Sequence, residues 1–379
     1  MSAHTNHAMI AENHERIICM KASATTPLDK IAKPLLKWFR AQARSLPWRD
    51  DPRPYYVWVS EIMLQQTRVT AVLPYFSRFI AALPDVRALA AVDDDALMKL
   101  WEGLGYYSRA RNLKKAAALI TEKYGSKIPC DFDSLLSLPG VGRYTAGAIA
   151  SIAYGQRNPA VDGNVLRVVS RLTASREDIL RGATKRAVEN ALAEIMPKDA
   201  GQFNQAMMEL GALVCLPRAA HCQECPLASL CRAHAEGLEN ELPVKETKKE
   251  RRVETRTVLL IEKHGKFAIA KRPKRGLLAD LWEFPNLSGE KKRGEILALC
   301  KNAGLSPKSV RRMKAARHIF THIEWQLTGW HIRLSNAAEQ VGEARSAYGN
   351  SPLPPLTWAS NRELSETYSI PTAFKAYMP

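Results

Sequence analysis

Four cysteines within seventeen residues constrain this chain more than any other feature of its sequence. Their spacing is C-x6-C-x2-C-x5-C, at Cys215, Cys222, Cys225 and Cys231. Four thiolates this close together can hold one metal centre, and both tetrahedral zinc and a [4Fe–4S] cluster take four cysteine ligands. Zinc ribbons usually contribute two C-x2-C pairs, whereas this segment contains one. Four unligated thiols would be unusual at this spacing, so the sequence predicts a metal centre here.

A second stretch, residues 138–165, combines a glycine turn with an aspartate. The turn, Leu138-Pro139-Gly140-Val141-Gly142, lies between a helical segment at 132–136 and a segment rich in small residues. Exposed backbone N–H groups at the start of a helix bind phosphate, and Asp162 follows the turn after about twenty residues. This pattern indicates a helix–hairpin–helix that holds DNA close to a carboxylate. A helix–turn–helix packed for structure alone is the alternative.

The chain divides into a helical part and a part with strands. Helical periodicity continues to residue 242, and Thr26-Pro27 and Ser60 are predicted to begin helices. Residues 243–256 are charged and lack a hydrophobic face, which predicts a linker. Beyond it lie strand-like segments at 257–262, 267–271, 318–327 and 330–334, and a helix at 294–303. We therefore expect a disordered leader at 1–25, an all-α domain at 26–242, the linker, and an α+β domain at 257–379.

The formal net charge of +17 indicates a polyanionic partner. The excess is concentrated in residues 243–379, which hold 25 Lys and Arg against 13 Asp and Glu. No apolar run reaches the roughly 18 residues that a membrane-spanning helix requires. Residues 1–24 have no continuous apolar region of the kind found in secretory signals. We expect an intracellular protein, cytoplasmic or in the bacterial nucleoid, that is neither secreted nor bound to a membrane.

The cysteine spacing, the glycine hairpin and the downstream Asp162 together resemble the endonuclease III superfamily of DNA glycosylases. The resemblance implies a two-lobed, all-α helix–hairpin–helix glycosylase domain that clasps DNA. It also implies that the four cysteines hold a [4Fe–4S] cluster with a mainly structural role, and that Gly140 and Gly142 lie in the DNA-binding hairpin.

Tyr144 decides which reaction of that superfamily the sequence predicts. Members that cut the DNA strand carry a lysine at this position, directly after the segment matching Leu138–Arg143, and its amine attacks the sugar. A phenol cannot form the resulting imine, and no lysine occurs between residues 128 and 184. The motif therefore predicts base removal by water without lyase chemistry.

The segment 58–67, WVSEIMLQQT, resembles the active-site helix of the MutY-type adenine DNA glycosylases. This family removes adenine mispaired with 8-oxoguanine or guanine. Adenine leaves only when N7 is protonated, and the sugar then gains oxocarbenium character that a fixed carboxylate can stabilise. Glu61 would be the general acid, with a pKa raised by an apolar pocket, and Asp162 the ionised carboxylate. As structural alternatives, Glu61 complements a helix dipole and Asp162 is a helix N-cap.

The same resemblance assigns further residues to two tasks. One group positions the catalytic groups and water or lines the adenine pocket, and consists of Tyr144, Asn164, Gln205 and Arg49. A second group wedges into the base stack while the adenine leaves the duplex, and consists of Gln66 and Tyr106.

Residues 276–285, GLLADLWEFP, resemble the opening of the Nudix-like domain of MutY-type proteins. A working Nudix hydrolase holds Mg²⁺ on a glutamate-rich helix, whereas the corresponding positions here are Ala298, Lys301 and Asn302. The expected role of this domain is therefore recognition. The family senses 8-oxoguanine with a Phe-Ser-His loop, and the matching Phe320-Thr321-His322 keeps the hydroxyl but adds a methyl group.

These features predict a monofunctional glycosylase that hydrolyses the N-glycosidic bond of adenine opposite 8-oxoguanine or guanine. Two alternatives are a bifunctional endonuclease III-like glycosylase/lyase and a non-catalytic iron–sulfur DNA-binding protein. The expected partner is double-stranded DNA that carries these mispairs. We expect a monomer, with a clamp or mismatch-repair protein as a further partner.

Overall fold

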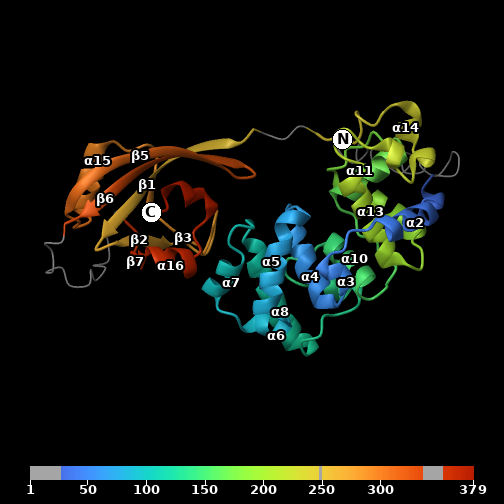
Figure 1. Ribbon diagram of the computed structural model, residues 1–379, viewed down its shortest axis with the longest axis horizontal. Coiled ribbons are helices and arrows are strands. Elements are labelled where there is room, and N and C mark those ends of the chain that lie inside the picture. The colour runs from blue at the N-terminus through green and yellow to red at the C-terminus, as the bar shows by residue number, and fades with distance from the viewer. Residues whose placement is uncertain (1–26, 247–249, 336–352) are drawn as a thin grey trace, which may run out of the picture. The chain divides into compact units, whose positions relative to one another are not determined.

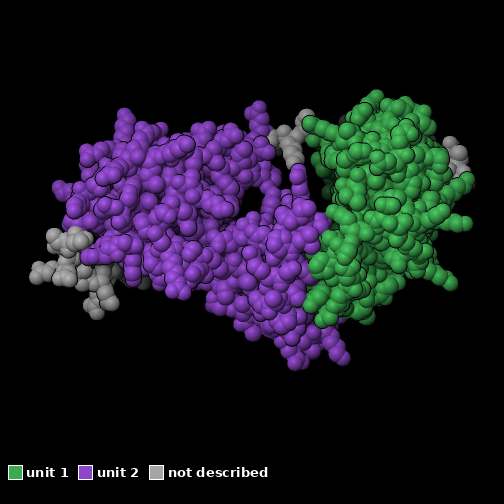
Figure 2. All heavy atoms as spheres, in the orientation of Figure 1, with its two compact units in different colours: residues 1–58, 130–137, 141–246 green, residues 59–129, 138–140, 247–379 purple. Residues whose placement is uncertain are grey.

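The computed structural model describes residues 27–246, 250–335 and 353–379. The chain forms two compact units, which Figure 2 colours separately. Unit 1 comprises residues 1–58, 130–137 and 141–246, and unit 2 comprises residues 59–129, 138–140 and 247–379. The expected leader at 1–25 and the expected helix start at Thr26 lie outside the described residues. In the described part of the chain, every helix is too short or too polar to cross a membrane.

The regular secondary-structure elements described in unit 1 are all helices (Figure 1). Its elements are η1 (Pro27–Lys30), α2 (Ala32–Gln42), α3 (Pro47–Asp50), α9 (Phe132–Leu136), α10 (Arg143–Ile152), α11 (Gly163–Leu172), α12 (Gly182–Glu194), α13 (Ala200–Leu213), η2 (Cys222–Glu224), η3 (Ala228–Leu230) and α14 (Arg232–Glu236). Helices α2, α11 and α13 pack together around the buried side chains of Leu35, Val165 and Phe203. Partly buried Cys215, Cys225 and Cys231 pack against the same core, so the cysteine segment is attached to the helices that carry Asp162.

Helix α4 (Pro54–Leu64) runs from unit 1 into unit 2. It begins at Pro54, so the prediction that Ser60 caps this helix is wrong. Proline suits the first helical position because its missing N–H has no intrahelical acceptor there. The side chains of Tyr55, Val57, Trp58 and Val59 are all buried. A helix buried on every side has no amphipathic pattern, which explains why the sequence did not reveal its first two turns.

The other helices of the helical part of unit 2 are α5 (Val69–Ala82), α6 (Val86–Ala91), α7 (Asp94–Leu100) and α8 (Ser108–Tyr124). Two of them begin with an aspartate N-cap. Asp85 accepts a hydrogen bond from the backbone N–H of Ala88, and Asp93 accepts from the N–H groups of Asp95 and Ala96. Helices α6 and α8 pack closely against each other.

The C-terminal part of unit 2 is a mixed sheet with helices on both faces (Figure 1). Its elements are β1 (Arg252–Lys263), β2 (Lys266–Lys271), β3 (Trp282–Glu283), β4 (Asn286–Ser288), α15 (Arg293–Asn302), β5 (Pro307–Ile319), β6 (Ile323–Leu334), β7 (Thr357–Ser360), α16 (Asn361–Glu366) and η4 (Thr372–Tyr377). The main strand order is β3-β2-β1-β6-β5, with β1 and β6 parallel. Alternate residues of β1 face η4 or α15, so residues 257–261 are all buried.

Two sequence predictions for this part are corrected by the structure. Residues 252–256 of the expected linker belong to strand β1. Their charged side chains pack against one aromatic ring, since Trp325 Nε1 donates to Glu254 and the Arg256 guanidinium lies 4.6 Å from the ring centroid. The expected strand at 318–327 is instead split by a turn at 320–322, and β6 continues through Gly329. The ring of Tyr377 covers Gly329 so closely that no Cβ would fit there.

Candidate active site

Asp162 is the N-cap residue of helix α11. Its Oδ1 accepts hydrogen bonds from the backbone N–H groups of Asn164 (2.9 Å) and Val165 (2.8 Å), and its Oδ2 accepts from Asn164 Nδ2 (2.8 Å). The side chain is half-buried. Burial raises the pKa of Asp162 above its ordinary value, while these donors and the charge of Arg167 act in the opposite direction. The structural alternative is therefore realised, and the same contacts fix the carboxylate in one orientation.

Arg167 connects this carboxylate to the cysteine segment. Its Nη2 donates to Asn164 Oδ1 (2.9 Å) and to the carbonyl oxygen of Gly211 (2.7 Å), and its Nε donates to the carbonyl oxygen of Cys215 (2.8 Å). A Cβ on Gly211 would lie 2.6 Å from Asn164 Cβ, so only glycine allows α11 and α13 to approach this closely. Arg167 thus connects Asn164, which donates to Asp162, with the backbone of Cys215.

The four cysteines follow helix α13, and Cys225 interacts electrostatically with the other three. Burial and the charges of the neighbouring cysteines together raise the pKa of Cys225 to about 11, against the opposing effect of a hydrogen bond from the backbone of Leu227. Burial also raises the pKa of Cys222 and of Cys231. Thiols that destabilise one another's ionised form need a cation before all can become ligands, and this donor set suits a metal centre with four thiolates. Arg171 Nη1 lies 3.2 Å from Cys215 Sγ and donates to it.

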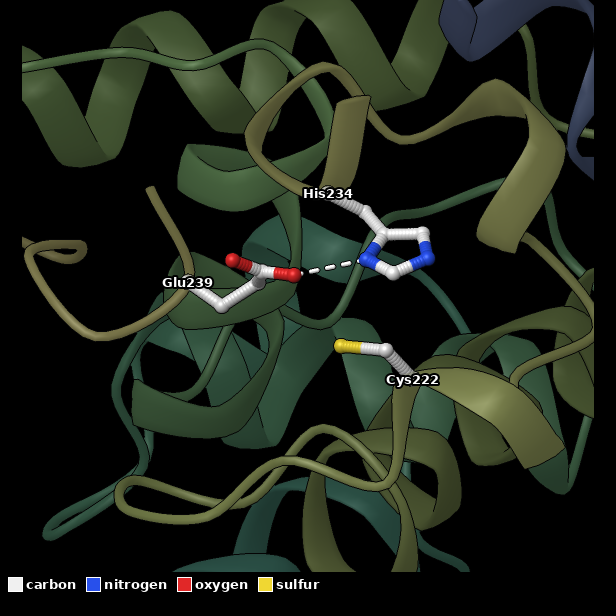
Figure 3. A group of neighbouring side chains, drawn as sticks. All are labelled: Cys222, His234 and Glu239. Carbon is white, nitrogen blue, oxygen red and sulfur yellow. Dashed lines mark hydrogen bonds and ion pairs between the residues drawn. The ribbon is translucent and has the colours of Figure 1, made fainter. Parts of the chain in front are cut away.

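Cys222 also belongs to a second group of ligand-type side chains. Figure 3 shows its thiol beside the paired side chains of His234 and Glu239. His234 Nδ1 lies 2.6 Å from Glu239 Oε1, and the ligand atoms of all three residues lie within 4.8 Å of one another. Two candidate ligand sets, the four cysteines and this group, therefore share Cys222.

Tyr144 on helix α10 contacts helix α13, which carries Gln205. Tyr144 is in the first turn of α10, and its hydroxyl donates to Met208 Sδ (3.1 Å) on α13. Gln205 precedes Met208 by three residues, so the two share a face of α13. Gln205 is half-buried, and its Nε2 donates to the carbonyl oxygen of Gly201 (3.3 Å).

Arg49 occupies a buried ionic cluster. Its Nη2 donates to Glu209 Oε2 (2.8 Å), and Arg44 forms a bidentate pair with the same carboxylate (2.7 and 2.6 Å). The side chain of Glu209 is 1% exposed. Burial alone would raise the pKa of Glu209, but the two guanidinium groups outweigh it and lower that pKa to about 2. Arg49 is thus held by Glu209, a partner that the sequence did not suggest.

Glu61 lies in the part of α4 that belongs to unit 2 and is 5% exposed. It is three residues from the C-terminal end of the helix, where the helix dipole is negative. The suggestion that Glu61 merely complements the dipole at a helix N-terminus is therefore wrong.

Gln66 and Tyr106 are exposed residues in two loops of unit 2. Their φ angles are +59° and +46°, in the left-handed region that non-glycine residues rarely adopt. Such conformations persist only where surrounding contacts impose them, and they are concentrated at functional sites. One buried residue, Arg109, contacts both loops.

The hairpin glycines have different surroundings. Gly140 has a φ of +79°, and a Cβ there would lie 2.7 Å from Asn112 Cβ. Gly142 is the N-cap residue of α10 and has open space around it. A glycine N-cap leaves the first N–H groups of a helix accessible to a phosphate.

The segment 320–322 forms the turn between β5 and β6. Phe320 is half-buried, and its ring centroid lies 4.5 Å from that of His318 and 4.9 Å from that of Trp325. Thr321 and His322 are exposed, and Thr321 Oγ1 lies 2.9 Å from the hydroxyl of Tyr106. Phe320 therefore anchors the turn, while the two polar residues face outward.

Three arginines and one glutamate of this region were missed by the sequence reasoning, namely Arg44, Arg109, Arg167 and Glu209. Arg109 and Arg167 stand in segments whose other residues suggest ordinary helix surfaces. Each also donates to backbone carbonyls more than forty residues away along the chain. A sequence contains no local signal for such contacts.

Comparisons with known proteins identify two families of domain in this chain. Residues 59–198 match the model of the HhH-GPD superfamily base excision DNA repair proteins, and residues 257–379 match the NUDIX domain model. The chain is 34% identical to the adenine DNA glycosylase of Buchnera aphidicola subsp. Schizaphis graminum, covering 79% of this chain and 87% of the relative. It is 32% identical to that of Rattus norvegicus, covering 90% of this chain and 77% of the relative.

A solved structure of a thermostable thymine-DNA glycosylase is similar to 55% of this chain and to 97% of its own length, with a TM-score of 0.50 and 25% identity. The helical part thus has the fold of a DNA glycosylase, and the sheet domain matches the NUDIX model. With two relatives above 30% identity that it covers over most of their length, the chain belongs to the adenine DNA glycosylase family.

Proposed function

We propose that the chain is a monofunctional DNA glycosylase that hydrolyses the N-glycosidic bond of adenine mispaired with 8-oxoguanine or guanine. The observation that carries this proposal is the buried carboxyl group of Glu61 near the end of helix α4, in a chain whose relatives are adenine DNA glycosylases. A carboxyl group can act as the general acid that protonates a leaving base.

In the proposed reaction, Glu61 donates its proton to N7 of adenine. The C1′–N9 bond then breaks, and its electron pair leaves with the base. Asp162, held by three N–H donors, stabilises the positive charge that develops on the sugar. Water adds to C1′ and returns a proton to Glu61, which restores the starting state. Preorganised hydrogen bonds to Asp162 mean that the carboxylate needs no reorientation during the reaction.

Tyr144 supports the assignment to base removal without strand cleavage. Its phenol cannot form an imine with the sugar, and its hydrogen bond to Met208 places the ring against α13. In the same reaction Gln205 faces the adenine from that helix, and Arg49 lines the pocket. Asn164 orients Asp162 through its side-chain amide.

Access to the adenine requires its extrusion from the duplex. Gln66 and Tyr106 fill the space that the base leaves, and both side chains are exposed in the structure. The exposed polar groups of Thr321 and His322 contact the 8-oxoguanine of the opposite strand, with Phe320 anchoring the turn. Gly140 and Gly142 place backbone N–H groups against the DNA phosphates.

The four cysteines hold a [4Fe–4S] cluster in this proposal. When bound, the cluster cross-links the segment that follows α13 and keeps it packed on α11. Iron and acid-labile sulfide should both be present at about four per chain, as four cysteine ligands imply. Stoichiometric zinc without sulfide would instead support a zinc site.

Adenine release under single-turnover conditions tests the function directly. The wild-type chain should release adenine from 8-oxoguanine:A and G:A duplexes and no base from a thymine-glycol duplex. Glu61→Gln should reduce the rate by about a thousandfold, as expected for loss of a general acid, while DNA binding persists. Glu122→Gln, at an exposed position of α8, is the matched control.

Two outcomes would favour the alternative functions. Strong covalent trapping of the wild-type chain on DNA by borohydride would indicate a bifunctional glycosylase/lyase. Tight binding with no base released would indicate a non-catalytic DNA-binding protein. Full turnover by Glu61→Gln would contradict the role of Glu61 even if adenine is released.

A further inference from the structure

Arg109 is a buried cation that contacts two separate loops of unit 2. It lies in the first turn of α8. Its Nη1 donates to the carbonyl oxygens of Ile62 (3.0 Å), Met63 (2.7 Å) and Gln65 (2.6 Å). Ile62 and Met63 lie in the last turn of helix α4, and Gln65 directly precedes Gln66. Carbonyl groups at a helix C-terminus lack intrahelical donors, and a cation there also complements the helix dipole.

The other terminal nitrogen of Arg109 binds the second loop. Nη2 donates to the carbonyl oxygens of Leu104 (3.0 Å) and Gly105 (3.1 Å), which directly precede Tyr106, and to Thr67 Oγ1 (3.3 Å). The guanidinium carbon also lies 5.5 Å from the ring centroid of Tyr106. One side chain thus fixes the backbone on the N-terminal side of both Gln66 and Tyr106.

We propose that Arg109 is a positioning residue that holds Gln66 and Tyr106 in their wedge conformations before DNA binds. This inference rests on the proposed function, because it takes these two residues as the wedge. Both residues have positive φ angles, and the contacts of Arg109 lie directly beside them. Wedge residues that are already ordered lose less conformational freedom on binding, so extrusion of the base is favoured.

A lysine cannot take the place of Arg109 in this arrangement. The planar guanidinium sends donors from two nitrogens in two directions, whereas an ammonium group is a single point. Burial lowers the pKa of Arg109 to about 10, so the group is still a cation at neutral pH. Its Nε–H is buried and has no hydrogen-bond partner among the described residues.

The test compares two substrates that differ in how much extrusion they require. One is a duplex with an 8-oxoguanine:A pair, and the other presents the same adenine opposite a one-nucleotide gap. Arg109→Lys should slow single-turnover release from the paired substrate by about tenfold or more, and from the gapped substrate by less than about threefold, since an unpaired base is extruded at little cost. Arg87→Lys, an arginine of the same unit with an exposed hydrogen bond to Ser126, is the control.

A fluorescence measurement follows extrusion separately from chemistry. With 2-aminopurine beside the target adenine, the wild-type chain should increase the emission as the stack opens. Arg109→Lys should remove most of that increase, while its circular dichroism stays close to that of the wild type. If Arg109→Lys does not fold, Thr67→Val removes one acceptor of Arg109 and should give a smaller loss with the same preference between substrates.

The outcomes separate this inference from the proposed function. Equal losses on both substrates, or unchanged fluorescence, would contradict a positioning role. Wild-type rates for Arg109→Lys on the paired substrate would also contradict it. Failure of the wild-type chain to release adenine from the 8-oxoguanine:A duplex would instead overturn the proposed function. In a Gln66→Ala background, Arg109→Lys should have a reduced effect, because the residue through which it acts is already missing.

Discussion

The hydroxyl group of Tyr106 lies 2.9 Å from that of Thr321, and a hydrogen bond joins them within unit 2. Tyr106 is 46% exposed and carries a strained backbone, whereas Thr321 lies in the turn between two long strands. In the proposed function, Tyr106 enters the base stack and Thr321 contacts the lesion. This hydrogen bond therefore gives extrusion and lesion recognition a direct physical connection.

Thr321→Val should reduce the preference for 8-oxoguanine:A over G:A by about fivefold, which corresponds to the loss of one hydrogen bond of about 1 kcal/mol. Valine keeps the shape of threonine but has no hydroxyl for Tyr106 or for the base. Thr321→Ser keeps the hydroxyl and should stay close to the wild type. Single-turnover rates on the two duplexes measure the preference, and equal preferences for all three proteins would contradict the connection.

Asp162→Asn should separate the structural role of this residue from its catalytic role. Asparagine is as good an N-cap as aspartate. Because burial raises the pKa of Asp162, its ionised form costs stability at neutral pH, and the neutral amide should leave the unfolding midpoint unchanged or higher. Adenine release should fall by at least about a hundredfold, since the charge that stabilises the sugar is gone.

The matched control is Asp93→Asn, at an N-cap that accepts two backbone N–H groups in α7. Its activity should equal that of the wild type. A drop in the unfolding midpoint of Asp162→Asn, accompanied by full activity, would mean that Asp162 serves only as a helix cap.

Features that depend on neighbouring residues could be predicted from the sequence. The N-cap contacts of Asp162 reach only two and three residues along the chain. The expected strands at 257–262 and 267–271 lie within β1 and β2, which are next to each other in the sheet, and the turn between β1 and β2 has His264 and Gly265 at positive φ. The NUDIX match likewise covers the expected α+β domain. Local spacing and turn chemistry were sufficient in each case.

Features that depend on distant contacts could not be predicted. The start of α4 was hidden because its first turns are buried on all sides. The charged residues 252–256 suggested a linker, although Trp325 and strand β6 make them part of the sheet. Arg109 and Glu209 are charged residues of types that usually lie on the surface, and only the fold reveals their buried partners. The burial and the partners of such residues are set by tertiary contacts.

Gly211→Ala should impair the site without altering any of its functional groups. The added Cβ would lie 2.6 Å from Asn164 Cβ and 3.2 Å from two backbone atoms of Asn164, so α11 must move. Overpacking of this kind costs about 1–3 kcal/mol, and displacement of Asn164 disturbs the hydrogen bond to Asp162. We expect a lower unfolding midpoint and a lower rate of adenine release. Gly294→Ala, in α15 where a Cβ has open space, should change neither.

Glu209 should make unit 1 sensitive to acid. Its pKa is lowered from 4.5 to about 2 in the folded chain, so its stabilising effect is fully present above pH 4.5 and is lost as the pH falls towards 2. A shift of this size corresponds to about 3 kcal/mol. Glu209→Gln should lower stability at neutral pH and flatten its dependence on pH in this range, as measured by denaturant unfolding monitored by circular dichroism.

Glu241→Gln, which breaks an exposed ion pair with Arg176, should leave that pH dependence intact, because such pairs contribute little. An unchanged pH profile for Glu209→Gln would show that Arg44 and Arg49 do not stabilise this carboxylate.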